Sequence, residues 1–90
     1  MSYKGADVEG LRVLANAMLS SKHDVEAALA AAKTDLANLP WHGPDRDRYV
    51  SEWGQHESLL RNICIGLEHA AADAVKHAVA QEQASGGHGW

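Results

Sequence analysis

Three side chains in the second half of the chain could bind a metal ion. His69, Asp73 and His77 recur every four residues, a spacing that places them one turn apart on one helix face. Imidazole and carboxylate are Zn²⁺ ligands, but a tetrahedral site needs a fourth, which only His88 or a partner chain would supply. The preferred interpretation is a row of solvated surface residues. We therefore expect no metal and no cofactor, and keep a metal-dependent assembly module as an alternative.

Other reactive residues give no sign of an enzyme. Cys64 is the only cysteine, so an internal disulfide is excluded, and we expect it to pack as a small apolar residue. His56 lies near Trp53 and is predicted to be a buried, neutral, hydrogen-bonded core residue. The sequence contains no recognisable nucleophile–histidine–acid arrangement and no glycine-rich phosphate loop. We predict a non-enzymatic protein.

The composition argues against nucleic acid as a partner and against insertion into a membrane. The net charge is −4 and the basic residues are scattered, whereas a nucleic-acid-binding domain usually presents a basic face. No apolar run is long enough to span a membrane, so we predict no membrane insertion. No N-terminal segment resembles a general secretory signal peptide. If the protein is exported, it must take another route.

The elements that carry these residues are predicted to be two long helices in one domain, 1–90. Asp7 is a good N-cap for a helix over about 8–39, and Pro40 ends it. Two prolines and a glycine predict a turn at 40–44, and Pro44 suits the first turn of a second helix over about 45–83. The glycine-rich end, 84–90, is predicted to be a flexible tail.

Apolar residues follow both predicted helices in steps of three and four, which is typical of helices that pack along their length. A short loop requires these helices to fold back as an antiparallel hairpin. The apolar stripe is wider than one helix contact, so we predict that two hairpins pair as a four-helix bundle. The predicted dimer and core seam contains Leu11, Met18, Val25, Leu29, Leu36, Tyr49, Trp53, Leu60, Ile63 and Leu67.

The turn carries a recognisable motif. Trp41-His42-Gly43 stands at mid-chain, followed by Pro44-Asp45, Tyr49 and Trp53. This pattern resembles the signature of the WXG family, the early-secreted-antigen-like proteins of bacterial type VII secretion. The resemblance covers nearly the whole chain in length and layout. It implies a helical hairpin with the Trp-x-Gly turn at its tip, where Trp41 either plugs the hairpin end or contacts a secretion component, or does both.

The second half of the family's export signal departs from its usual form. Family members or their partners carry an aromatic residue followed four positions later by an acid, near the end of the second helix. Here the nearest match is His69-Ala70-Ala71-Ala72-Asp73, led by histidine. His69 and Asp73 are the candidate export signal; otherwise they are ordinary solvated residues.

The resemblance implies a small type VII secretion substrate that folds in the cytoplasm as a homodimer or with a WXG paralogue. It would be recognised by the secretion ATPase and then released outside the cell or at its surface. The alternative is an intracellular chaperone or targeting adaptor that delivers a larger effector or toxin.

Overall fold

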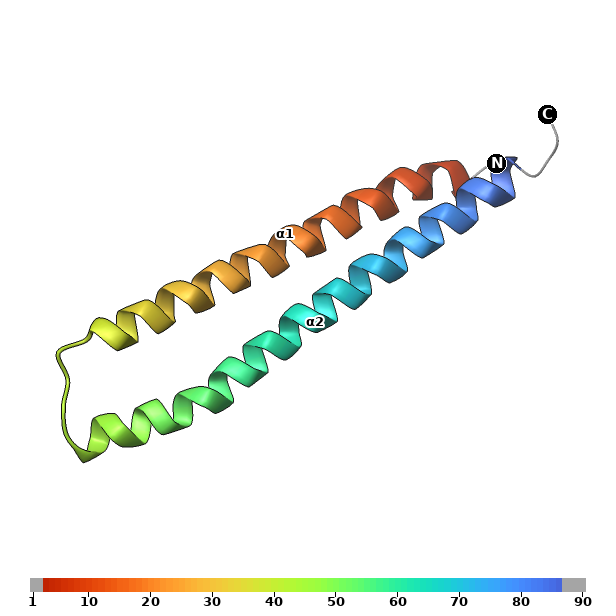
Figure 1. The fold of residues 1–90 in the computed structure, drawn as a ribbon. Helices are drawn as coiled ribbons and strands as arrows, with labels where there is room; N and C mark the ends of the chain where they lie inside the picture. The colour runs from red at the N-terminus through yellow and green to blue at the C-terminus, as the bar shows by residue number, and fades with distance from the viewer. Residues whose placement is uncertain (1–2, 87–90) are drawn as a thin grey trace.

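A computed structural model describes residues 3–86 of the chain, with side chains described for residues 7–84. Two helices, α1 (Tyr3–Asn38) and α2 (Pro44–Gly86), run antiparallel and pack along their length (Figure 1). The molecule is a rod with principal extents of 71 × 17 × 16 Å. Over the described residues there is no strand. The prediction of an all-helical hairpin is confirmed.

The helix ends differ in part from those expected. Helix α1 begins at Tyr3, so Asp7 lies inside the helix and is not its N-cap. At the other end α1 finishes at Asn38, since Leu39 precedes a proline and is driven out of helical geometry. Helix α2 continues to Gly86, past the predicted end near Gln83. Alanine and glutamine extend a helix readily. The rest of the predicted tail, 87–90, lies outside the described residues.

One continuous seam joins the two helices. We define it as the buried or half-buried residues that alternate in steps of three and four. On α1 these are Val8, Leu11, Ala15, Met18, Lys22, Val25, Leu29, Ala32 and Leu36, and on α2 they are Val50, Trp53, Glu57, Leu60, Cys64, Leu67, Ala71, Ala74, Ala78 and Gln81. The mean step of about 3.5 residues keeps one face of each helix against the other over the whole rod.

Small side chains make up the best-buried part of the seam. Ala15, Ala71 and Ala74 form a cluster with exposed fractions of 2–6%, and Leu11 and Met18 pack against it. Alanine at these positions lets the two backbones approach closely, and leucine or methionine from the facing helix fills the remaining space. The seam is therefore tight but contains little apolar surface.

Three residues expected in the seam lie outside it. Tyr49 is 38% exposed and Ile63 is 46% exposed, and His56 is also exposed. Each directly precedes a seam residue, whereas Trp53, Leu60 and Leu67 lie in the seam as expected, so every second position of the expected α2 stripe was displaced by one residue. The physical reason is that the hairpin packs on Cys64 and the alanines, whose small size allows closer contact than the bulkier neighbouring side chains.

The alanine seam predicts that a larger side chain lowers the stability of the protein when it replaces a seam alanine, but not when it replaces an exposed one. Ala71→Leu is expected to lower the free energy of unfolding by about 1–3 kcal/mol, because the extra carbons have no space between the helices. Ala72→Leu adds the same atoms at an exposed position and should leave stability nearly unchanged. Urea unfolding followed by circular dichroism measures both, and equal effects would contradict the packing described.

Candidate functional site

The hairpin tip, residues 39–43, presents the Trp-x-Gly motif. Trp41 is half-buried, and its ring lies 5.8 Å from that of Tyr49 with an interplanar angle of 44°. This tilted aromatic contact closes the end of the hairpin. Leu39 beside it is 51% exposed. The tip therefore combines a held indole with accessible apolar surface.

Gly43 shapes the start of α2. Its φ is +111°, a backbone conformation that side-chain-bearing residues rarely adopt. The Gly43 carbonyl accepts a hydrogen bond from the Asp47 N–H at 3.1 Å, and Pro44 occupies the first helical position. Asp45 and Asp47 lie in the first turn, where negative charge is favourable at the helix N-terminus. Glycine therefore suits the backbone conformation of the chain reversal.

The candidate export residues are exposed and only partly brought together. His69 and Asp73 both lie at the surface of α2. Asp73 lies 3.6 Å from His77, measured between Oδ2 and Nε2, whereas within residues 7–84 no ion pair joins it to His69. In the same part of the chain no group of three or more potential metal ligands gathers. The metal-assembly alternative thus has no support in the described side chains.

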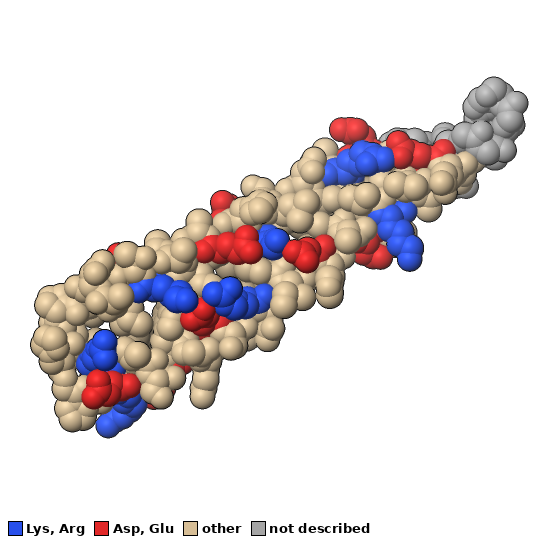
Figure 2. All heavy atoms as spheres, viewed as in Figure 1, with Lys and Arg blue, Asp and Glu red and all other residues tan. Residues whose placement is uncertain are grey.

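One side of the hairpin carries all the ion pairs between the helices that the described side chains form. We call it the charged flank: the residues that directly follow the seam residues, with the seam side chains that reach toward them. Arg12 bonds to Glu82, and Lys22 lies 2.8 Å from Glu68. Figure 2 shows acidic and basic side chains alternating along this face. Within residues 7–84, these ion pairs neutralise most of the charges on the flank.

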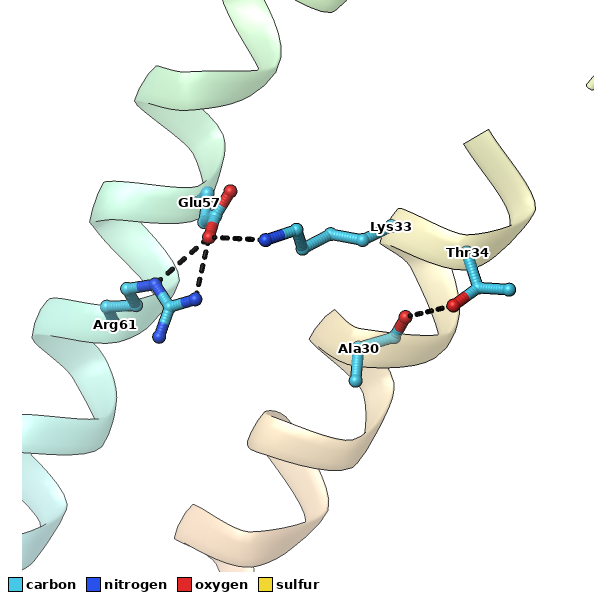
Figure 3. A network of polar contacts seen from close by, with 5 residues as sticks. All are labelled: Ala30, Lys33, Thr34, Glu57 and Arg61. Atoms are coloured by element: carbon cyan, nitrogen blue, oxygen red, sulfur yellow. Dashed lines mark hydrogen bonds and ion pairs between the residues drawn. The ribbon is translucent and has the colours of Figure 1, made fainter. Parts of the chain in front are cut away.

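Glu57 is the centre of one network on this flank. Its Oε2 accepts hydrogen bonds from Arg61 at 2.7 and 3.1 Å and from Lys33 of α1 at 3.2 Å (Figure 3). Glu57 belongs to the seam, so these cations satisfy a carboxylate that packing partly removes from water. The contact also ties the two helices together near the tip.

These contacts shift pKa values in directions that favour the ion pairs. The hydrogen bonds from Arg61 and Lys33 lower the pKa of Glu57. The hydrogen bond from Lys22 lowers the pKa of Glu68, and the same bond raises the pKa of Lys22. Each partner is thereby held in its charged form across neutral pH.

A shallow groove runs beside this network. It has a volume of about 590 Å³ and is lined by Lys22, Glu26, Leu29, Ala30, Lys33, Thr34, Arg61, Cys64, Ile65 and Glu68. The Cys64 thiol is buried and donates to the Lys22 carbonyl at 3.8 Å. The groove therefore has an apolar floor and a rim of charges that are already paired, and Cys64 packs as part of that floor.

Comparison of the chain with protein-family models, curated proteins and solved structures gave no match. Over the described residues, neither helix contains an apolar stretch long enough to cross a lipid bilayer.

The conformation of Gly43 predicts opposite effects for two glycine substitutions. Gly43→Ala should lower the free energy of unfolding by about 1–2 kcal/mol, because alanine is strained at this positive φ. An added methyl group would meet no atom within 4 Å at either Gly43 or Gly54, so sterics are matched. Gly54→Ala lies within α2 and should raise stability by about 0.5–1 kcal/mol. Chemical denaturation of both variants measures the difference, and stabilisation by Gly43→Ala would contradict it.

The ion pairs predict acid-sensitive stability. A carboxyl group whose pKa is lower in the folded state stabilises the fold above its unfolded pKa and loses that effect as the pH falls through the folded pKa. We expect the thermal midpoint to drop between about pH 5 and pH 3, and Glu57→Gln to make that drop smaller. Glu52→Gln removes an exposed carboxyl group that forms no ion pair with the side chains of residues 7–84, and serves as the control. Equal pH profiles for wild type and Glu57→Gln would contradict the role of this network.

Proposed function

We propose that this protein is a small, non-enzymatic substrate of a WXG-type (type VII) secretion system, exported as a folded dimer. The observation that carries the proposal is the Trp-x-Gly sequence at the reversal of a two-helix hairpin. Gly43 adopts a positive φ there, and Trp41 packs on Tyr49 at the tip. The position of these residues at the hairpin reversal supports the proposal.

The packing of the hairpin supports association with a partner. Among residues 7–84 the buried hydrophobic side chains are those of Ala15, Leu29, Cys64, Ala71, Ala74 and Ala78, most of which are small. Leu59 and Ile63 lie one turn apart with exposed fractions of 61% and 46%. A second hairpin laid over such residues would form a four-helix bundle and add the apolar contacts that one seam lacks.

Recognition in this proposal involves the hairpin tip and a second region on α2. The turn between α1 and α2, which contains Trp41, lies at one end of the rod (Figure 1). His69 and Asp73 belong to the half of α2 that is farther from this turn. In a bundle of two antiparallel hairpins, the tip of one chain would lie near the helix ends of its partner. A composite signal of this kind would be read by the secretion ATPase.

Secretion in the native host tests the proposal. The tagged protein should reach the culture fluid only when the type VII ATPase is present, without cell lysis. Trp41→Ala should lower the secreted amount at least about tenfold, whereas His42→Ala, at the exposed middle position of the motif, should not. The double change His69→Ala and Asp73→Ala should also reduce export, with His77→Ala as its control.

Strict retention of the wild-type protein in cells would refute the substrate role. In that case co-purification with a larger protein would identify the alternative, an intracellular adaptor. ATPase-independent release would contradict both roles.

A further inference from the structure

The ion pairs that border the groove on the charged flank do not balance at each of its ends. At one end Lys22 lies 2.8 Å from Glu68 and 3.9 Å from Glu26, measured from Nζ to Oε2, so one ammonium group is shared by two carboxylates. The ring of His23 lies 3.4 Å from Glu26, and it adds positive charge only when it is protonated. This end of the groove therefore carries an excess of negative charge near neutral pH.

The other end of the groove has the opposite excess. Lys33 and Arg61 both bind Oε2 of Glu57, at 3.2 and 2.7 Å (Figure 3), so two cations share one carboxylate. Lys33 and Arg61 line the groove and are exposed, whereas Glu57 lies in the seam. The groove therefore has a negative end and a positive end.

The separation of the two ends is the same along both helices. Seven residues lead from Glu26 to Lys33 on α1 and from Arg61 to Glu68 on α2, which corresponds to about 10 Å along a helix axis. Because the helices run antiparallel, the two acids lie at one end and the two cations at the other. An extended peptide chain advances about 3.3–3.6 Å per residue. A chain of three residues therefore spans this separation.

Between its two ends the groove is apolar. Leu29 and Cys64 are each 5% exposed and belong to its floor, while Ile65 beside them is 50% exposed. Ala30 also lines the groove and is exposed. The volume of about 590 Å³ lies within the range of about 300–1,000 Å³ that is usual for small-ligand sites. Concave shape and charges of opposite sign at its ends distinguish this apolar surface from the exposed aliphatic residues elsewhere on the hairpin.

We propose that this groove binds a short apolar peptide, about three residues long, whose amino and carboxyl termini are both free. The peptide's ammonium group lies beside Glu26, the acid with the longer contact to Lys22. Its carboxylate lies beside Lys33, and its middle side chain packs on Ala30 and Ile65, which the hairpin alone leaves exposed to water. Complementary charges fix the direction of the peptide, and burial of apolar surface supplies attraction. Peptide binding goes beyond the proposed function and does not depend on export.

Calorimetric titration of the purified protein with the tripeptide alanyl-leucyl-alanine tests the groove. At about pH 7 and about 50 mM salt we expect saturable binding. Acetylation of the amino terminus and amidation of the carboxyl terminus each remove one charge, and each should weaken binding about twofold to fivefold, the effect of an exposed ion pair. A salt concentration of about 500 mM should reduce these differences. No binding at about 5 mM peptide, or equal affinity for the free and the doubly blocked peptide, would overturn the proposal.

Two substitutions connect each terminus of the peptide with its own end of the groove. Glu26→Gln should weaken the preference for a free amino terminus and keep the preference for a free carboxyl terminus, and Lys33→Gln should do the reverse. Glu52→Gln and Lys76→Gln make the same charge changes at exposed positions outside the groove and should keep both preferences. If Glu26→Gln and Lys33→Gln affected both preferences alike, or no more than the controls do, the assigned direction of the peptide would be wrong.

A second pair of substitutions locates the site. Ala30→Leu places additional carbons in the groove, whereas Ala27→Leu adds them at an exposed position that does not line it. Ala30→Leu should weaken peptide binding at least about tenfold, and Ala27→Leu should leave it unchanged. In the wild type, the amide NMR signals that shift on peptide addition should belong to residues 26–34 and 61–68. Shifts confined to other residues, or binding that needs only the free carboxyl terminus, as the end of a longer chain would, would refute the assignment.

Discussion

Close approach of two helices along an alanine-rich seam is the constraint on which this structure depends. Ala15, Ala71 and Ala74 bring α1 and α2 together, and Ala78 is completely buried. Dispersion contacts are strongest at such short separations, but small side chains remove little apolar area from water. The small side chains that allow close contact between the helices therefore also limit the hydrophobic stabilisation of that contact. A chain built in this way gains from further coverage, which is the physical basis for expecting a partner.

Polar residues in the seam are accommodated by the charged flank. Lys22 and Glu57 occupy seam positions, where unpaired charges would carry a desolvation cost. Glu68 and the pair Lys33–Arg61 hold them at hydrogen-bond distances. Exposed ion pairs add little stability, but here they remove a penalty and hold the helices side by side at matched positions. Because these charges satisfy one another, the seam can contain Lys22 and Glu57 without leaving either charge unpaired.

Much of the fold could be predicted from local rules. Pro40 and Pro44 bound the reversal because proline restricts the residue before it and suits the first helical turn. The packing face of α2 was harder to predict. A pattern of apolar residues favours Ile63 and Tyr49, yet the hairpin buries Cys64 and Ala71. Hydropathy ranks isoleucine above alanine, but backbone separation depends on side-chain size, so the smaller residues face the other helix.

The sequence by itself determined the helical hairpin and the place of its turn, at which Trp41 and Gly43 lie. These follow from near-neighbour physics: helix propensity, proline geometry and the conformational freedom of glycine. Only the tertiary structure decided which side chains face each other across the helices, and hence that Glu57 lies between Lys33 and Arg61. Residues far apart in the chain come to lie on the same side of the hairpin only when the two helices pack together. If one helix were rotated by a single residue, a different set of its side chains would face the other helix.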